Sequence, residues 1–480
     1  MDFSAYFKGK KITVMGLGLL GRGVGDVAFL AESGADLIVT DLKAEEQLNE
    51  SLVKLKDFPN IKFTLGEHKM EDFEGRDMIL VAAGVPMDSP YLTHAREKGI
   101  ELAQSAALFA KLSKIPMIGI TGTRGKSTTT AMIAHIIETA TGELVIKGGN
   151  VRGVSNLQLL KEVKEDSLAV FELDSWQLQG FGWAEISPAV AVFTTFMDDH
   201  LNYYGSTSSP QVGSTSSPQA GVLRTSDVLS DSKERELAME AYFADKANIF
   251  LNQEESGTLV TTPEVFERIK EFARDKNVTL GQEVVLVDTS IIPDDARLSM
   301  PGEHNRLNAA LAVAACRAIG LSDEEIFDAL PSFPGVEGRL ELVATTDAGV
   351  KIYNDNNATT PQATIAGLEA VGKDKNVILI AGGADKNIDV APLALAIGKY
   401  CKNVILLAGS GTDKLVPLLH GGPVGTSIFI DLDAALAEAV RLAAPGDVIL
   451  FSPAFASFGM FTNEYERNDK FLDLIKQYAD

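Results

Sequence analysis

The sequence predicts an α/β fold with several separate, mostly parallel sheets. Short runs rich in Val, Ile and Leu alternate with longer helical patterns, which is typical of parallel sheets buried on both faces. Residues with chemical character lie at the ends of these runs, where open α/β sheets bind their ligands. At about 150 residues per domain, a length of 480 residues predicts roughly three domains.

The expected strands recur along most of the chain. They occupy residues 11–15, 36–41, 77–84, 115–122, 167–174, 189–195, 350–355, 376–383, 403–409 and 447–453. The residues of chemical character at or just after their ends are Gly16, Asp41, Gly84, Gly122, Asp174, Asp199, Asp355, Gly382 and Ser452.

Composition narrows the class of protein. The chain is 45% apolar and 23% charged, the balance of a soluble globular protein. Its net charge of −23 repels nucleic acid and anionic membranes, so we expect neither as a partner. The two cysteines, Cys316 and Cys401, fit a reducing compartment. The first residues lack the apolar core of a signal peptide, and no apolar run could span a bilayer. We expect a cytoplasmic protein.

The first expected strand leads into a glycine-rich loop. "ITVMGLGLLGRG" places Gly16, Gly18 and Gly21 between a strand and a helix, and Asp41 ends the next strand. This pattern resembles the dinucleotide fingerprint, in which glycines admit a pyrophosphate and the acid takes ribose hydroxyls. It permits three interpretations: a nicotinamide-dependent oxidoreductase, a glycine turn of purely structural use, or a domain for another diphosphate nucleotide.

A second glycine-rich loop favours the last of these. "GITGTRGKSTTT" follows the strand run at 115–122 and ends in Lys-Ser at a helix start. The spacing departs from strict Walker A, but the loop still predicts a phosphate nest, with Lys126 on the β- and γ-phosphates and the Ser127 hydroxyl on Mg²⁺. A solvated lysine on a structural turn is the alternative. The predicted ATP contacts in this loop are Gly122, Thr123, Gly125, Lys126, Ser127 and Thr128.

This loop resembles the G-T-[NR]-G-K-[ST] loop of the Mur ligase family, which contains ATP-dependent amide ligases of peptidoglycan-precursor and folyl-polyglutamate synthesis. Further resemblances run through the chain in order: "GGN" at 148–150, "FELDSWQL" at 171–178, "DDHLNYYG" at 198–205, "YFADKANIF" at 242–250, "PGEHNRLNAALA" at 301–312, "GRLE" at 338–341, "YNDNNATTP" at 353–361, "AGGADKNID" at 381–389 and "SPAFASF" at 452–458.

Within the family, the chain is most similar to the members that add D-glutamate to UDP-N-acetylmuramoyl-L-alanine. The resemblance implies a Rossmann-like UDP-substrate domain at 1–108, a central P-loop ATPase domain at 109–335 and a Rossmann-like C-terminal domain at 336–480. ATP would phosphorylate the substrate carboxylate, and the amino group of the acceptor would attack the resulting acyl phosphate through a tetrahedral intermediate. A monomer is implied, because the family closes its site within one chain.

The resemblance also implies residue roles. Lys126, His200 and Lys246 would be catalytic, with Lys246 carbamylated, and two Mg²⁺ ions would be held by Ser127, Glu172 and His200. Asn308 would face adenine, Arg339 the ATP phosphates and Asp355 the ATP ribose. The UDP substrate would contact Gly18, Leu19, Asp41, Gly84 and Asn150, and the acceptor amino acid Lys386 and Ser457.

An octapeptide written twice, "GSTSSPQV" and "GSTSSPQA", starts at Gly205. Its Ser, Thr, Gly, Pro and Gln cannot bury enough apolar surface to offset ordering, so we expect mobility. It separates His200 from Lys246, which the family joins by a short loop. The segment at about 205–235 is therefore predicted to be an insertion inside the central domain, and a passive one.

Several positions depart from the family pattern. Asn357 stands where the D-glutamate-adding members have lysine, and Thr462, Glu464 and Gly338 replace a lysine, a phenylalanine and a histidine. Loss of cations and gain of a carboxylate would weaken dicarboxylate binding, so a different acceptor amino acid stays open. A folate-type ligase is a further alternative, but such ligases lack the Rossmann-like N-terminal domain. Another alternative, a non-catalytic family member that serves as a scaffold, fits poorly with the retained Lys126, Glu172, His200, Lys246 and Asp355.

Overall fold

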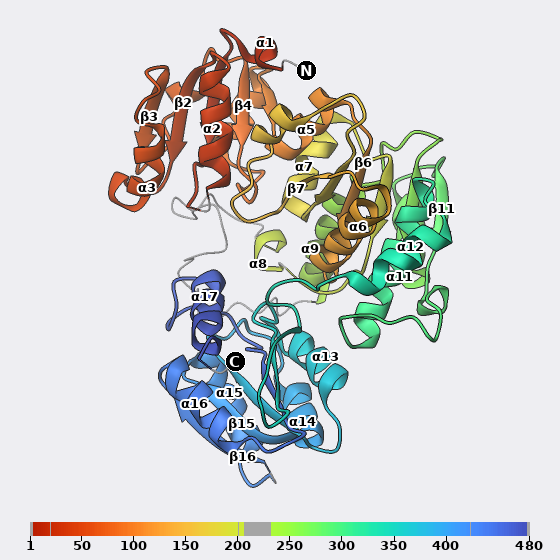
Figure 1. The fold of residues 1–480 in the computed structure, drawn as a ribbon. Coiled ribbons are helices and arrows are strands. Elements are labelled where there is room, and N and C mark those ends of the chain that lie inside the picture. Colours follow the sequence, from red (N-terminus) through yellow and green to blue (C-terminus); the bar gives the residue numbers. More distant parts are fainter. Residues whose placement is uncertain (1–2, 20, 200, 206–231, 423, 478–480) are drawn as a thin grey trace. The chain divides into compact units, whose positions relative to one another are not determined.

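The computed structural model describes residues 3–19, 21–199, 201–205, 232–422 and 424–477. It confirms the α/β class, since strands and helices alternate and the strands form three sheets (Figure 1). The chain divides into two compact units, residues 1–291 with 310–329, and residues 292–309 with 330–480. The division into three domains stays a prediction. His200 and nearly all of the predicted insertion lie outside the described residues.

The first sheet, in the first unit, is entirely parallel and has the order β3-β2-β1-β4-β5. Val14 and Val39 face one core, whereas Met15 and Ile79 face another, so both faces are buried as the apolar runs predict. The strands are β1 Lys11–Met15, β2 Asp36–Asp41, β3 Ile61–Leu65, β4 Met78–Val81 and β5 Glu101–Ala103. The helices are α1 Ser4–Phe7, α2 Arg22–Glu32, α3 Glu45–Leu55, η1 Met70–Phe73 and α4 Pro90–Glu97.

The second sheet is also parallel and has the order β11-β10-β9-β6-β8-β7, which puts β6 between β9 and β8. The strands are β6 Met117–Thr121, β7 Ile146–Gly149, β8 Ala169–Glu172, β9 Val190–Phe193, β10 Thr258–Thr261 and β11 Glu283–Leu286. The helices are α5 Ser105–Ser113, α6 Lys126–Thr141, η2 Gln158–Glu162, α7 Ser175–Ala184, α8 Leu201–Tyr204, α9 Ser232–Ala247, α10 Pro263–Asp275, η3 Thr289–Ile291, α11 Glu303–Ala318 and α12 Asp323–Ala329.

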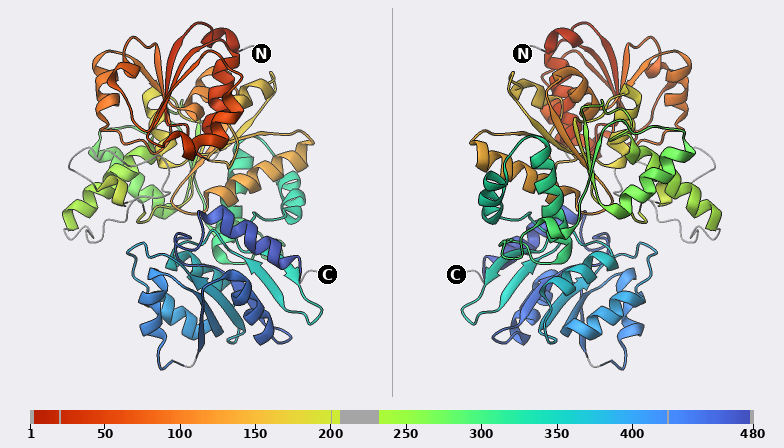
Figure 2. Two further views of the ribbon diagram at one scale, coloured as in Figure 1. Left: turned by 90° about the vertical axis from the view of Figure 1, so that its left-hand side faces the viewer. Right: turned by 90° about the vertical axis from the view of Figure 1, so that its right-hand side faces the viewer.

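The third sheet, in the second unit, has the order β12-β13-β17-β14-β15-β16, and only β12 is antiparallel to its neighbour. Along β14, Leu379 enters one core and Ile380 the other, and helices cover both faces (Figure 2). The strands are β12 Glu341–Thr345, β13 Lys351–Asn354, β14 Val377–Gly382, β15 Cys401–Leu407, β16 Gly425–Phe429 and β17 Val448–Phe451. The helices are η4 Leu330–Ser332, α13 Pro361–Val371, α14 Ala391–Tyr400, α15 Ser410–Leu419, α16 Leu432–Leu442 and α17 Glu464–Ile475.

Short polar side chains begin several of these helices by accepting a backbone N–H of the first turn, which satisfies a group without an intrahelical partner. These caps are Asp174, Thr262, Thr360, Asp431 and Asn463.

Cys316 and Cys401 are buried free thiols. Among the described residues, no helix combines the length and the apolar character needed to cross a membrane.

Candidate active site

The predicted phosphate loop connects β6 to α6 in the first unit. Gly122 has a φ of 140°, and a Cβ atom there would lie 2.0 Å from Thr194 Oγ1, so only glycine fits. Lys126, Ser127 and Thr128 form the first turn of α6. The positive end of the helix dipole favours an anion at this turn.

Two threonines that follow β9 hold the loop from the side. Thr123 N donates to Thr195 O at 2.7 Å, and Arg124 N donates to Thr195 Oγ1 at 2.9 Å. Thr194 Oγ1 donates to Arg124 O at 2.5 Å. The amides of Thr123 and Arg124 therefore point at the end of the neighbouring strand in this structure. Sequence reasoning missed the role of Thr194 and Thr195, although both are the last residues of the expected strand at 189–195.

Two lysines converge on the loop. Lys126 Nζ donates to Gly122 O at 3.0 Å and to Thr123 O at 3.2 Å. Lys246 Nζ donates to the same Gly122 oxygen at 2.9 Å. Lys246 is almost fully buried, and burial followed by repulsion from Lys126 holds its pKa well below the usual value for lysine. The structure thus brings two of the predicted catalytic residues to one carbonyl group.

A partly buried carboxylate, that of Asp245, lies one residue before Lys246 on α9. Asp245 Oδ2 accepts from Gln179 Nε2 at 2.7 Å and from Tyr204 OH at 2.8 Å. Burial raises the pKa of Asp245 to about 6, against the opposing effect of these two donors. Tyr203 OH donates to Val85 O at 3.2 Å. Together these bonds fix α8, the short helix that directly follows position 200.

Glu172 ends β8, the strand beside β6, and is buried. Its carboxylate therefore lies at the carboxyl ends of the strands, where the phosphate loop also starts. A serine hydroxyl and a carboxylate are hard oxygen ligands of the kind that Mg²⁺ takes, so Ser127 and Glu172 fit a magnesium site. Across the described residues, no group of three or more His, Cys, Asp and Glu side chains could hold a metal.

Asn150 follows β7 and is tied to Glu172 twice. Asn150 N donates to Glu172 O at 2.7 Å, and Asn150 Nδ2 donates to Glu172 Oε1 at 3.4 Å. The structure thus joins a predicted substrate contact to a predicted metal ligand. Arg22, which sequence reasoning missed, donates from Nη1 to Asn150 Oδ1 at 2.7 Å.

Asp41 holds the first glycine loop. Its Oδ2 accepts from Leu17 N at 2.9 Å and from Gly18 N at 3.1 Å, and its Oδ1 accepts from Lys43 N at 2.9 Å. The carboxylate is engaged with its own loop, so direct contact with the UDP substrate stays a prediction. Leu19 is half exposed, and Gly84 lies beside Trp176.

The predicted adenine, phosphate and ribose contacts lie in the second unit. Asn308 Nδ2 donates to Asn305 Oδ1 at 3.2 Å. Asp355 follows β13, and its two oxygens accept from Leu340 N at 3.1 Å and from Ser452 Oγ at 2.8 Å. Arg339 precedes Leu340 and acts electrostatically on this carboxyl. These bonds bring Arg339 and Asp355 together.

Burial raises the pKa of Asp355 to about 7, which predicts a pH-dependent stability. The folded state then holds a proton that the unfolded state releases near pH 4, so this contribution is full below about pH 4 and lost by about pH 7. The free energy of unfolding should fall by up to about 4 kcal/mol over that window. Asp355→Asn should flatten the decrease, measured by urea unfolding at stepped pH, and an equally steep decrease in the variant contradicts the prediction.

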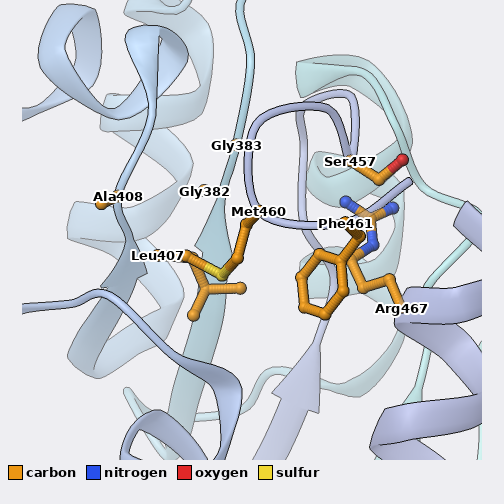
Figure 3. Close-up of a pocket in the computed structure, with 8 residues that line it drawn as sticks. All are labelled: Gly382, Gly383, Leu407, Ala408, Ser457, Met460, Phe461 and Arg467. Atoms are coloured by element: carbon orange, nitrogen blue, oxygen red, sulfur yellow. The ribbon is translucent and has the colours of Figure 1, made fainter. Parts of the chain in front are cut away.

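The predicted acceptor residues also lie in the second unit. Lys386 Nζ donates to Thr359 Oγ1 at 2.9 Å. Ser457 is buried and lines a small pocket, where its hydroxyl lies on the same side as the Arg467 guanidinium, with Leu407 and Met460 opposite (Figure 3).

Arg467 is a buried cation of this pocket that sequence reasoning missed. Its Nε donates to Asn356 Oδ1 at 2.8 Å and its Nη2 to Asn356 O at 2.9 Å. Burial lowers the pKa of Arg467 to about 10. In the sequence Arg467 stands among charged residues, "EYERND", a pattern typical of a solvent-exposed helix face.

Family models match three stretches of the chain. The Mur ligase MurD-like N-terminal domain matches residues 10–104, the Mur ligase middle domain residues 120–209, and the Mur ligase glutamate ligase domain residues 338–455. Solved structures share the fold: a UDP-N-acetylmuramate-alanine ligase from Thermotoga maritima is 18% identical with a TM-score of 0.56, covering 98% of this chain and 99% of that chain. A MurF ligase from Thermotoga maritima in complex with ADP is 16% identical with a TM-score of 0.56, covering 99% and 96%.

Curated relatives extend over almost the whole chain. A UDP-N-acetylmuramoylalanine–D-glutamate ligase from Roseiflexus sp. is 36% identical, with 98% of this chain and 99% of the relative covered. An enzyme of the same name from Treponema pallidum is 32% identical, with 98% of each covered. Similarity of this extent confirms the resemblance read from the motifs, and the chain therefore belongs to the Mur ligase family.

Proposed function

We propose that this protein is an ATP-dependent ligase that adds D-glutamate to UDP-N-acetylmuramoyl-L-alanine, a step of peptidoglycan-precursor synthesis. The observation that carries the proposal is the phosphate loop, on which Lys126 and Lys246 converge, in a chain whose full-length relatives bear that enzyme name. The family assignment gives no support to a nicotinamide-dependent oxidoreductase. The proposal retains a monomer in the cytoplasm, small-molecule substrates, and neither nucleic acid nor membrane as a partner.

ATP binding is proposed at the phosphate loop, with further contacts from Asn308, Arg339 and Asp355. Joining a carboxylate to an amine in water is unfavourable, so the carboxylate is first phosphorylated. In this proposal Lys126 neutralises the charge of the phosphate that is transferred, and the backbone amides of the first turn of α6 orient it. Positioning and neutralisation of charge are the main contributions a protein makes to phosphoryl transfer.

Ser127 and Glu172 are proposed to hold Mg²⁺, together with His200, and two ions are expected. Bound magnesium would supply neutralisation of the phosphate charge. The proposed carbamate on Lys246 requires a neutral amine, and the depressed pKa of this buried lysine supports it. The resulting anion would also remove the repulsion between Lys246 and Lys126.

The acceptor amino acid is proposed to bind at Lys386 and Ser457. Nearby, Asn357 donates from Nδ2 to Glu337 O at 3.3 Å, and Glu464 begins α17. Because Asn357 and Glu464 replace a cation and an apolar side chain of the D-glutamate-adding members, a Mur-type ligase that adds another amino acid is the second candidate. D-Glutamate leads because the relatives that cover the chain carry that name.

An ADP-release assay tests the proposal. The enzyme receives UDP-N-acetylmuramoyl-L-alanine, ATP and Mg²⁺, together with D-glutamate, L-glutamate, D-lysine or a neutral amino acid. We expect ADP and the amide product with D-glutamate, and much less with the others. A clear preference for another amino acid would select the second candidate. No ADP with any of them would exclude both.

A further inference from the structure

A line of hydrogen bonds joins the first glycine loop to Glu172. Arg22 is the first residue of α2, and its Nη1 donates to Asn150 Oδ1 at 2.7 Å. Asn150 Nδ2 in turn donates to Glu172 Oε1 at 3.4 Å. Arg22 thereby reaches the proposed metal carboxylate through a single amide group.

The chemistry of the three groups selects one orientation of that amide. A guanidinium only donates hydrogen bonds, and a carboxylate only accepts them. An amide between them satisfies both only with its oxygen toward Arg22 and its nitrogen toward Glu172. The flipped amide would place donor against donor and oxygen against carboxylate, so Arg22 determines which face of Asn150 meets Glu172.

The backbone at both ends of this line is held in place. Asp26, one turn after Arg22 on α2, accepts from Ser155 Oγ at 2.6 Å and from Leu157 N at 3.1 Å. At the other end, Gly149 has a φ of 85°, and a Cβ atom there would lie 2.0 Å from Glu172 O. Only glycine allows this approach, which places Asn150 against the end of β8.

We propose that Arg22 is a positioning residue of the ligase reaction: by orienting the Asn150 amide, it fixes the Glu172 carboxylate for Mg²⁺. The inference rests on the proposed function, because it takes Glu172 as a metal ligand. Within the described part of the chain, no carboxylate forms an ion pair with Arg22, and Asn150 Oδ1 is its hydrogen-bond acceptor. Groups that orient metal ligands are worth about 10- to 100-fold in metal affinity.

The test measures metal binding directly and needs no turnover. Mn²⁺ is titrated into the enzyme with ADP present, and free Mn²⁺ is followed by electron paramagnetic resonance. Arg22→Met should raise the Kd for Mn²⁺ roughly 10-fold, and Arg22→Lys, which keeps a donor, should raise it less. Urea unfolding of each variant verifies that the fold is retained. An Arg22→Met variant that binds Mn²⁺ as tightly as the wild type overturns the inference.

A matched control separates positioning from packing. Lys161 forms an ion pair with Glu32 at 2.5 Å and so also ties α2 to the segment after Asn150, but at the far end of the helix. Lys161→Met should leave the Kd for Mn²⁺ unchanged. An increase equal to that of Arg22→Met would show that looser packing of α2 is the cause, and would refute positioning.

A double-mutant cycle tests the route through Asn150. If Arg22 acts through this amide, then Arg22→Met should add little once Asn150→Ala is present, because interacting residues are not additive. Fully additive changes in the Kd would refute the route. The wild-type ADP-release assay is independent of this cycle, so failure of the proposed function and failure of the role of Arg22 give different results.

Discussion

Lys126→Ala should reduce the rate of ADP release by roughly 10²–10³-fold, which is the usual cost of removing one preorganised group from a developing charge. The ammonium of Lys126 lies over the phosphate loop, within 3.2 Å of two loop carbonyl oxygens. A bound triphosphate would replace these carbonyls as its partners. The ADP-release assay with saturating D-glutamate measures the loss.

Lys147→Met is the matched control for this variant. Lys147 lies on β7, is half exposed and pairs with Glu138 of α6, the helix that Lys126 begins. Such exposed pairs contribute little to stability. The Lys147→Met variant should retain wild-type turnover. Unchanged activity of Lys126→Ala would eliminate the assigned phosphate loop, whereas a lowered urea midpoint in Lys126→Ala alone would trace its loss of activity to unfolding.

Lys246→Met is expected to lower activity by roughly 10²-fold or more, because the carbamate that this lysine would carry cannot form on methionine. In the wild type, enzyme equilibrated with ¹³C-bicarbonate should show a carbamate signal by NMR, and the variant should lack it. Lys233→Met, at an exposed position on the same helix α9, should keep both signal and activity.

The carbamate signal should depend on pH in a defined direction. Only the neutral amine reacts with CO₂, and burial of Lys246 holds its pKa well below that of a free lysine. The neutral fraction therefore extends to lower pH than in an exposed lysine, and the signal should decrease on acidification as the amine becomes protonated. A wild-type enzyme without any carbamate, yet fully active, would remove this role from Lys246.

The sheets show which strands a single sequence reveals. The expected runs correspond to strands that have a neighbour on each side, such as β1, β6 and β14. These strands are apolar on both faces, so their composition is unmistakable. The strands at the sheet edges, β3, β5, β7, β11, β12 and β16, escaped prediction, and so did β10, a short buried strand between β9 and β11. Several of the edge strands are partly exposed, as β11 illustrates. A short run that mixes apolar and polar residues shows no clear hydrophobic periodicity.

The residues of the candidate site also divide into those that sequence motifs predict and those that only the structure reveals. Lys126 and Lys246 were predicted from motifs, and the structure brings both to Gly122 O. Thr195, Arg22 and Arg467 were not predicted, because each acts on a partner distant in sequence. Thr195 holds Arg124, Arg22 reaches Asn150, and Arg467 binds Asn356. Nothing in the local pattern around these residues marks such partners.

The sequence by itself determined the α/β class and the position of the phosphate loop, because buried strands and glycine turns impose strong local patterns on composition. It also carried the family motifs in order. Only the tertiary structure decided which side chains face one another, since hydrogen-bond partners depend on the order of strands in a sheet. The ties from Asn150 to Glu172 exist because β7 and β8 are neighbours, and no spacing along the chain specifies that.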